Sequence, residues 1–567
     1  MTIEFKPYPF TAQRHAARVP DLADGVEKRR HAVAIVGGGP VGLTLALGLA
    51  NHGIACVLIE ADDSICFGSR AICISRRSLE IVQRVGALDR FLAIGLPWAG
   101  GRSFYRSEEV LHFQMPQDEN QKLPPMINLA QYHIEQCLLD VAEQKSELID
   151  YRWQTKVTAI DSHADGARLW LSTACGDYQL DADWVVACDG GRSTIREALG
   201  LKLTGTSYEG RYVIVDIELE SDRPTERLAY FDPACNPGST VLVHKQPHNV
   251  WRIDYQLPDG EDAEAAIKPE NVLPRVQSVL DMMGERGKWA PIWITIYKAN
   301  ALTLERYRHG RALFAGDAAH LVPIFGVRGV NSGIDDADNL AWKLAYVVRG
   351  LAGERLLDSY SDERVFATRE NLSYGTKSTE FMAPPTFAFA LMRRAVLSLA
   401  ARHPTVRPLI NPRQTSAITY IESALNIVDR NKDEFAAGPV PGAVLPECPL
   451  TIVNDGTTKE AFITDLLEPC FTAFLFSRTG TISAEFVALA ETLQNKHLRL
   501  RYVPLTMHLD GSVKGLHGWD HTGRLFETYG AKPGTAYLVR PDGHLLGRWR
   551  DARAGDIAAG LEHALHP

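Results

Sequence analysis

The chain has 567 residues, enough for two or three domains with separate hydrophobic cores. Hydrophobic residues make up 45% of it and charged residues 23%, a composition typical of globular proteins, and no apolar run is long enough to predict a membrane span. The formal net charge of −9 disfavours binding to nucleic acid, because a basic surface is needed to displace counterions from phosphates.

The leader, residues 1–31, contains three prolines, has no clear periodicity and has no apolar signal core. We expect it to lie as an extended strap across the rest of the chain. The nine cysteines of the chain are scattered, with no Cys-x-x-Cys pair and no metal-ligand spacing. This pattern predicts reduced thiols, a cytoplasmic location and no metal site.

Residues 32–210 are predicted to begin a Rossmann-like domain. The apolar run 32–36 is typical of a buried parallel strand, a helix is expected over 41–51, and a second strand over 54–59 ends at Glu60. This order corresponds to a βαβ unit of the usual length.

Residues 211–300 alternate between apolar and polar side chains, which predicts an antiparallel sheet with one face on a core. The expected strands of this substrate-binding sheet are 212–220, 240–244, 250–257 and 292–298. Residues 301–435 then return to the first domain and its helical region, with a strong amphipathic helix predicted over 333–348.

The stretch 436–442 is rich in glycine and proline and predicts a linker. The alternation of strands and helices over 443–567 favours a small thioredoxin-like module, although no Cys-x-x-Cys pair is present for dithiol chemistry. The predicted fold class is therefore α/β. It comprises a Rossmann-like domain, an inserted and mostly antiparallel sheet, and this C-terminal module.

A G-x-G-x-x-G fingerprint is present between the first predicted strand and helix, as Gly37-Gly38-Gly39-Pro40-Val41-Gly42. Gly37 permits a tight turn, Gly39 lets the backbone approach a diphosphate, and Gly42 lets the helix pack closely on the strand. The helix that begins at Pro40 and Val41 would direct its first N–H groups at the phosphates. Glu60 would accept hydrogen bonds from a ribose diol. By itself the fingerprint fits FAD and NAD equally.

Two further motifs, Asp189-Gly190 and Gly316-Asp317, each place an aspartate after a predicted strand, where open α/β sheets bind ligands. Asp317 is expected to bond a ribityl hydroxyl, and His320 is interpreted as structural. The loop 323–333 would direct backbone N–H groups and a helix N-terminus at a flavin, stabilising negative charge on its ring. The residues expected there are Pro323, Gly329, Val330 and Asn331.

Together these motifs resemble those of single-component flavoprotein aromatic hydroxylases. The closest resemblance is to the branch of 3-(3-hydroxyphenyl)propionate and phenol hydroxylases that carries an added thioredoxin-like domain. The resemblance extends over residues 30–400 and implies a bound FAD. It also implies that Arg70 and Gln131 lie against the FAD, and that Pro323 presents its backbone beside the ring. A surface salt bridge is the alternative for Arg70, and a helix cap or exposed amide is the alternative for Gln131.

The resemblance implies that NADH or NADPH reduces the FAD and that O2 then forms a flavin C4a-hydroperoxide, which hydroxylates a small phenolic compound in aromatic catabolism. The expected partners are this aromatic substrate, O2 and a second copy of the chain in a homodimer, with no nucleic acid and no membrane. Two alternatives stay open. One is oxygenation of a larger polyketide-type aromatic, and the other is a non-catalytic flavin-binding sensor or scaffold.

Substrate-side candidates come from the predicted sheet. Strand alternation places Arg252 and Asp254 on the same face. Arg252 is expected either to bind a substrate carboxylate or to form a structural ion pair. His244 and Asp254 are candidates for the base that accepts the phenol proton. Tyr297 either points at the ring or is an ordinary half-buried sheet tyrosine.

Overall fold

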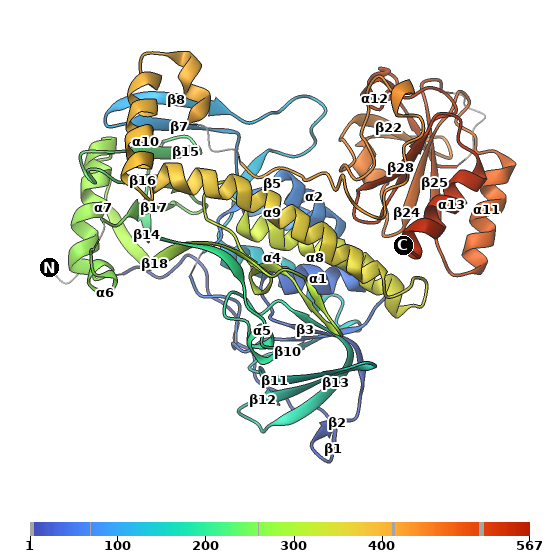
Figure 1. The fold of residues 1–567 in the computed structure, drawn as a ribbon, viewed down its shortest axis with the longest axis horizontal. Coiled ribbons are helices and arrows are strands. Elements are labelled where there is room, and N and C mark those ends of the chain that lie inside the picture. Colours follow the sequence, from blue (N-terminus) through green and yellow to red (C-terminus); the bar gives the residue numbers. More distant parts are fainter. Residues whose placement is uncertain (1–4, 69, 259, 411–413, 510–514) are drawn as a thin grey trace.

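The computed structural model describes residues 5–68, 70–258, 260–410, 414–509 and 515–567. Figure 1 shows a large body, coloured from blue to light orange, and a smaller orange and red body beside it that contains the C-terminus. Within the described ranges, no helix combines the length and the apolar character needed to cross a bilayer.

The large body contains a ten-stranded sheet whose central strands run parallel in the order β13-β3-β4-β10. Strand β20 pairs with the other edge of β13, also in parallel. The βαβ order predicted for the start of this domain is confirmed. The strands are β1 (Leu22–Ala23), β2 (Val26–Glu27), β3 (His31–Val36), β4 (Cys56–Ile59), β10 (Ile149–Arg152), β11 (Lys156–His163), β12 (Gly166–Ser172), β13 (Tyr178–Ala187), β19 (Arg308–His309) and β20 (Ala312–Phe314).

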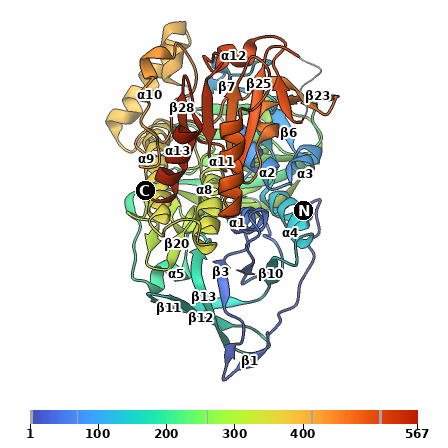
Figure 2. The same ribbon diagram turned by 90° about the vertical axis from the view of Figure 1, so that its right-hand side faces the viewer.

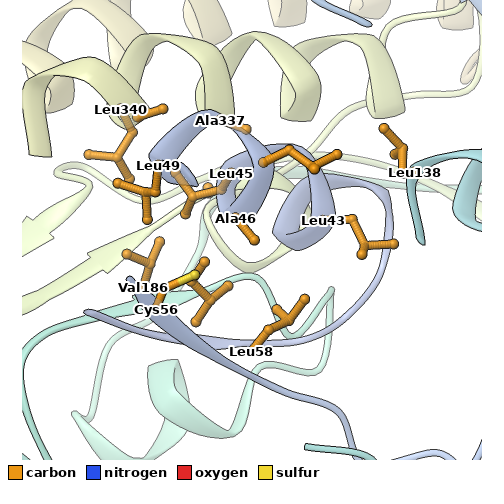
Figure 3. Packing of buried hydrophobic residues seen from close by; sticks show 14 of the residues in the cluster. Leu43, Leu45, Ala46, Leu49, Cys56, Leu58, Leu138, Val186, Ala337 and Leu340 are labelled. Carbon is orange, nitrogen blue, oxygen red and sulfur yellow. The ribbon is translucent and has the colours of Figure 1, made fainter. Parts of the chain in front are cut away.

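Helix α1 (Pro40–Asn51) lies between this sheet and helix α8 (Gly329–Val348), and Figure 3 shows its leucines among buried side chains from both. A Cβ added to Gly48 would lie 2.7 Å from the Cβ of Ala341, so the glycine lets the two helices approach closely. Because α1 is apolar on nearly all sides, burial fixes its position. Its N-terminus is thereby held at the carboxyl edge of the parallel strands.

A second sheet has eight strands in the order β21-β18-β14-β17-β16-β15-β7-β8, and most neighbours are antiparallel as predicted. Its alternating apolar residues pack on helix α7 (Pro269–Met283). The strands are β7 (Gly100–Tyr105), β8 (Glu108–Gln114), β14 (Thr204–Leu219), β15 (Arg227–Phe231), β16 (Thr240–Lys245), β17 (Val250–Gln256), β18 (Trp289–Thr303) and β21 (His320–Leu321).

The extent predicted for this sheet was too narrow, because strands β7 and β8 come from the range assigned to the first domain. Strand β7 pairs in parallel with β15, so the chain contributes to the second sheet before the first domain is complete. A separate third sheet has three strands in the order β5-β9-β6. Its strands are β5 (Cys73–Ser75), β6 (Leu96–Trp98) and β9 (Met126–Asn128).

Helices cover the large body, and the longest of them, α9, runs across it from α10 toward the small body (Figure 1). Helix α8 begins at Gly329, four residues before the predicted start, so the glycine-rich loop itself provides the first helical turn. The other helices of this body are α2 (Arg76–Arg84), α3 (Leu88–Ile94), α4 (Gln131–Glu143), α5 (Thr194–Ala198), α6 (Ala263–Ala266), α9 (Leu356–Met382) and α10 (Phe387–Ala400).

The small body is built on a seven-stranded mixed sheet in the order β23-β22-β26-β25-β24-β27-β28. Figure 2 shows helices α11 and α13 side by side over one face of this sheet. The elements are β22 (Pro449–Asn454), β23 (Thr457–Phe462), β24 (Phe471–Phe476), α11 (Ala484–Asn495), β25 (Leu500–Thr506), β26 (His517–Trp519), α12 (Arg524–Thr528), β27 (Ala536–Val539), β28 (Leu545–Trp549) and α13 (Ala554–Leu565).

The described part of the leader lies against the large body along much of its length. Strands β1 and β2 form a hairpin, and Val26 pairs with Gln179 of β13. Nearer the start, the buried ring of Tyr8 packs against Tyr132 of α4, with 4.9 Å between ring centroids. The leader therefore connects the far end of the first sheet with the region where the two large sheets meet.

Candidate functional site

The glycine turn before α1 is shaped by two close backbone approaches. Gly37 has φ +106°, and a Cβ there would lie 2.3 Å from the carbonyl oxygen of Cys188 in the neighbouring strand end. A Cβ on Gly42 would lie 2.0 Å from the carbonyl oxygen of Gly37. Gly39 differs, because the nearest atom to its added Cβ would be a carboxylate oxygen of Glu135 at 3.9 Å. The backbone at Gly39 therefore borders open space at the N-terminus of α1.

Glu60 follows strand β4 and lies next to this turn. Its carboxylate accepts hydrogen bonds from the backbone N–H groups of Gly38, at 2.6 Å, and of Asp62, at 3.0 Å. Burial raises the pKa of Glu60, against the lowering effect of these N–H groups. Pro40 is the first residue of α1, and Val41 faces the third motif, since a Cβ on Gly316 would lie 2.9 Å from it.

Asp189 stands at the carboxyl end of β13, as the second motif predicts. One carboxylate oxygen, Oδ2, accepts a hydrogen bond from the N–H of Ile195 at 3.3 Å. The other, Oδ1, is buried without a hydrogen-bond partner in the part of the chain that the structure describes. An unpaired buried acceptor is costly, so this oxygen is available to a donor from solvent or from a ligand.

The Gly316-Asp317 motif forms a short 3-10 turn after β20. The N–H of Gly316 donates to the Asp336 carboxylate at 2.9 Å, and His320 Nε2 lies 2.6 Å from the same oxygen. His320 is completely buried there, so its interpretation as structural is supported. The Asp317 side chain, in contrast, is exposed. Burial by the surrounding protein nevertheless raises the pKa of Asp317, while the charges of His320 and Arg70 lower it.

The loop after His320 leads into the N-terminus of α8. A Cβ on Gly329 would have no atom within 4 Å, and Val330 is half-buried. Pro323 is buried, with its ring 3.4 Å from where a Cβ on Gly375 of α9 would lie. The side-chain amide of Asn331 makes its hydrogen bonds within the protein. It accepts from the backbone N–H of Ser75 at 2.9 Å and bonds to three further groups nearby.

Arg70 and Gln131 lie close to one another, because Gln131 bonds the residue that follows Arg70. The Arg70 side chain is exposed, and its charge acts on Asp317. Gln131 is the first residue of α4, not its cap. The Gln131 amide accepts from the N–H of Ala71 at 3.3 Å and donates to Glu135 at 2.9 Å, so it is not a freely exposed side chain.

The second sheet presents a polar row toward these motifs. In register across the strands, His244 of β16 pairs with Arg252 of β17, and Arg252 pairs with Asp216 of β14. Arg227 of β15 lies beside His244, because the next residue along, Leu228, pairs with the residue before His244. The predicted common face of Arg252 and Asp254 is confirmed, since their neighbours along β17 pack in the opposite apolar core.

Arg252 forms a buried ion pair with Asp216, the structural alternative that the sequence left open. The guanidinium donates to the two Asp216 oxygens at 2.8 and 3.0 Å and to the carbonyl oxygen of Arg70 at 3.1 Å. The Tyr8 hydroxyl donates to the same Asp216 carboxylate at 2.9 Å. Asp216 and Tyr8 were not singled out from the sequence, because their partners lie far away in the chain.

Asp254 and His244 are both buried beside this ion pair. Burial raises the pKa of Asp254 to about 7, with Asp216 adding to the rise and Arg252 and Arg227 opposing it. Burial and the same two arginines hold the pKa of His244 well below its usual value, so the imidazole is neutral. Within the described residues, Asp254 Oδ1 and His244 Nδ1 have no hydrogen-bond partner.

Tyr297 of β18 connects the sheet with the Gly-Asp motif. It pairs in register with Tyr212 of β14 and is half-buried. Burial and the nearby Asp317 carboxylate raise the pKa of Tyr297, so the phenol is neutral. The fold therefore brings the three motifs and the polar face of the second sheet to one region.

A sequence model of a known family, described as an FAD binding domain, matches residues 30–373. The chain belongs to this FAD-binding family.

Two curated relatives have the same name, 3-(3-hydroxy-phenyl)propionate/3-hydroxycinnamic acid hydroxylase. The one from Klebsiella pneumoniae (strain 342) is 32% identical over 374 residues, which are 65% of this chain and 65% of the relative's own length. The one from Mycolicibacterium smegmatis is 28% identical over 559 residues, 94% of this chain and 93% of the relative. The first match thus spans just under two thirds of each protein.

Two solved structures have the same fold as this member of the FAD-binding family. One is the flavin-dependent monooxygenase PieE in complex with FAD and substrate, with a TM-score of 0.77, 23% identity, and coverage of 94% of this chain and all of that one. The other is aklavinone-11 hydroxylase with FAD and aklavinone, with a TM-score of 0.75, 22% identity, and coverage of 95% and 99%.

Proposed function

We propose that the residues around the three motifs hold FAD. The open backbone at Gly39 suits the diphosphate, the exposed Asp317 suits the ribityl chain, and the open space at Gly329 suits the flavin pyrimidine edge. The buried, unpaired Oδ1 of Asp189 supports a ligand donor at this edge of the sheet. In this arrangement Arg70 lies near the ribityl chain, and Gln131 acts by holding Ala71 and Glu135 in place.

We further propose that the protein is a monooxygenase that uses NADH or NADPH and O2 to hydroxylate a small phenolic compound. The observation that carries this proposal is the position of Asp254, which lies on the sheet face that meets the FAD motifs and has a pKa of about 7. The names of the curated relatives, which are hydroxylases of hydroxyphenyl compounds, support the same reaction class.

In this reaction the FAD, when bound, supplies the redox chemistry by accepting a hydride from the nicotinamide and reacting with dioxygen. The chain itself provides the acid–base chemistry. Asp254 Oδ1 is free to accept the phenol proton, and a pKa of about 7 lets the carboxylate take that proton near neutral pH and later release it. A phenolate ring is more electron-rich than a phenol ring, so the transfer favours hydroxylation.

The imidazole of His244 and the ion pair between Arg252 and Asp216 support this site. The neutral imidazole of His244 lies near Asp254 without adding charge. The ion pair between Arg252 and Asp216 anchors the segment at Arg70, which keeps the sheet and the motifs together. Burial of these groups excludes bulk water, which would otherwise divert oxidising equivalents to hydrogen peroxide.

The direct test measures NADH and NADPH oxidation by the FAD-loaded protein with a panel of phenols, together with hydroxylated product and hydrogen peroxide. We expect a phenol to stimulate oxidation and to give product in proportion to the nicotinamide consumed. Oxidation that yields peroxide with every phenol would overturn the proposal. A polycyclic aromatic included in the panel tests the alternative of a larger substrate.

We also propose that residues 443–567 form a thioredoxin-like module without dithiol chemistry. The parallel pair β24–β25 joined by α11, the antiparallel hairpin β27–β28 and the final helix α13 support this assignment. Cys448 and Cys470, the cysteines of this range, are both buried and free, and burial raises the pKa of each to about 11. We expect no dithiol reduction of insulin by the protein, and measurable activity would contradict the assignment.

A further inference from the structure

Helix α10 presents an apolar face to solvent. On one side of the helix, Val396, Leu397 and Ala400 are buried in the apolar cluster beneath it. On the opposite side, about half a helical turn away, the exposed side chains are again mostly apolar. A helix that is apolar on both sides is normally buried, so we expect this face to contact a partner. Its large exposed side chains are Phe387 (74% exposed), Leu391 (52%), Met392 (44%) and Leu399 (48%).

The orientation of α10 is fixed by Arg393. This buried side chain donates from Nη1 to the carbonyl oxygen of Met382 and from Nη2 to that of Gly238, both at 3.0 Å. The hydroxyl of Thr240, in β16, donates to the same Met382 carbonyl at 2.6 Å. The helix cannot turn its exposed apolar face toward the protein without breaking these bonds. Figures 1 and 2 both show α10 at the periphery of the large body, where that face is accessible.

The segment that contains α10 is basic within an acidic protein. Residues 381–410 contain four arginines and no lysine, aspartate or glutamate, which gives a formal charge of +4 in a chain whose net charge is −9. Arg394 borders the apolar face and Arg402 follows the helix. Both are exposed, and in the described ranges neither has a carboxylate within ion-pair distance. The Asp232 carboxylate, whose charge acts on Arg393, forms its ion pair with Arg106 at 2.9 Å.

A second copy of the chain fits this surface less well than an anionic surface does. Helix α10 has 14 residues, so its exposed face is about 21 Å long and about 10 Å wide. Pairing of two such faces across a twofold axis would bury only a fraction of the roughly 800 Å² per partner that stable interfaces bury. It would also bring the arginines of both copies together, with no acidic residue from this segment to balance them.

We propose that α10 docks the protein on a membrane surface that contains anionic lipids. The apolar face enters the boundary between headgroups and acyl chains, and Arg394 and Arg402 bind lipid phosphates beside it. The expectation that no membrane is a partner concerned spanning segments, which docking of this kind does not need. The inference goes beyond the proposed function and does not depend on FAD binding or on hydroxylation.

The first test measures co-sedimentation of the purified full-length protein with lipid vesicles. One set of vesicles is pure phosphatidylcholine, and the other has two parts phosphatidylcholine to one part phosphatidylglycerol. The protein should bind the mixed vesicles about tenfold or more tightly than the neutral ones, because each arginine near an anionic surface strengthens binding about fivefold. Added salt should reduce this preference by screening the charges. Absence of binding to the mixed vesicles would overturn the inference, as would equal binding to both sets.

Two double variants separate the apolar contribution from the charged one. Phe387→Gln with Leu391→Gln should weaken binding to the mixed vesicles by about tenfold or more, because two apolar side chains no longer enter the bilayer. Arg394→Gln with Arg402→Gln should weaken it by about tenfold or more and leave binding to neutral vesicles unchanged. All four side chains are exposed and Arg393 still holds the helix, so melting temperatures should match wild type. Wild-type affinity for mixed vesicles in either variant would contradict the proposed docking.

Leu92 of α3 and Arg499 of the small body provide matched controls, because they are 40% and 61% exposed and lie outside residues 381–410. Leu92→Gln and Arg499→Gln should leave vesicle binding unchanged, and losses equal to those of the α10 variants would show that binding is not specific to this helix. Sedimentation velocity without vesicles tests a second copy as the partner. If the wild-type protein is a dimer and Phe387→Gln with Leu391→Gln is a monomer, α10 lies in a dimer interface and the inference is wrong.

Discussion

Arg540 of the small body and Glu363 of α9 form a buried ion pair with two hydrogen bonds, Nη1–Oε1 at 2.7 Å and Nη2–Oε2 at 2.9 Å. The next residue of α9, Arg364, donates to Asp336 at 2.6 Å, and Asp336 accepts the N–H of Gly316 at 2.9 Å. A network of polar contacts, continued by the backbone of α9 between Glu363 and Arg364, therefore connects the C-terminal hairpin with the Gly-Asp motif. Through this network we expect the small body to stabilise the proposed FAD site, a role that requires no cysteines.

Replacing Arg540 with Met should destabilise the whole protein and weaken FAD retention. The substitution leaves Glu363 buried with Lys343, at 2.8 Å, as its one cationic partner among the described residues, and it also removes the arginine that pairs with buried Asp542. An incompletely paired buried charge costs about 3 kcal/mol. Urea unfolding and FAD release from the purified holoprotein measure the two effects. Arg499→Met in the same module is the control, because that arginine is 61% exposed and its ion pair with Glu468 contributes under about 1 kcal/mol. If FAD release by Arg540→Met were unchanged, the ion pair at Arg540 would have no influence on the Gly-Asp motif.

The local motifs could be predicted from the sequence because each depends on residues close together in the chain. The roles of Gly37, Gly39 and Gly42 follow from one turn between a strand and a helix. Strand alternation likewise gave the face of Arg252 and Asp254. Such patterns contain no information on which distant strand will pair with which.

Ion-pair partners and sheet extent could not be predicted for that reason. Asp216 lies 36 residues before Arg252, and only the pairing of β14 with β17 makes it the partner of that arginine. Strand β7 joined the second sheet through parallel pairing with β15, although its position in the chain suggested the first domain.

The pKa of Asp254 predicts a pH dependence of catalysis. The carboxylate must be ionised to accept the phenol proton, so the rate with a phenol substrate should rise with pH through about 7. Asp254→Asn should lower kcat by roughly 100-fold or more and remove this rise, since general-base contributions are of that size. The measurement is kcat against pH for both proteins with a substrate whose own pKa is far above 7. A wild-type profile that is flat between pH 5 and 8.5 would rule out Asp254 as the base.

The same pKa has a consequence for stability, with a definite sign. In the unfolded chain an aspartate has a pKa of about 3.9, so between about pH 4 and 7 the folded protein binds the proton more strongly. Stability attributable to Asp254 is therefore highest below pH 4 and is lost as pH rises to about 7. Relative to wild type, Asp254→Asn should become progressively more stable over this range, by up to about 4 kcal/mol at pH 7 and above. Urea unfolding at pH 5 and pH 8 measures the change, and a difference of the opposite sign would contradict the assigned pKa.

Removing the charge of Asp216 should be much more damaging than removing the hydroxyl that binds it. Asp216→Asn leaves Arg252 buried without an ionised partner, at a cost of about 3 kcal/mol or more. Tyr8→Phe removes one hydrogen bond to the same carboxylate and should cost about 1 kcal/mol. Urea denaturation of both variants tests this order. Equal effects would mean that the leader, and not the ion pair, holds this part of the sheet.

Two glycines of the fingerprint should respond differently to the same substitution. Gly37→Ala places a Cβ 2.3 Å from the carbonyl oxygen of Cys188 at φ +106°, so the turn must distort and the ligand-free protein should lose stability. Gly39→Ala has no protein atom closer than 3.9 Å, and its φ of −73° suits alanine, so the protein should fold with a melting temperature close to that of wild type.

The methyl group of Gly39→Ala nevertheless enters the open space in front of α1, where we place the FAD diphosphate. We expect the dissociation constant for FAD to rise by about tenfold or more, since loss of close backbone contact at a helix N-terminus removes charge-assisted hydrogen bonds worth over about 1.4 kcal/mol. Quenching of FAD fluorescence on adding the ligand-free protein measures this constant. FAD binding as tight as that of wild type would mean that the diphosphate lies elsewhere. A diphosphate at the start of α1 could not keep its close contact with the backbone in the presence of the added methyl group.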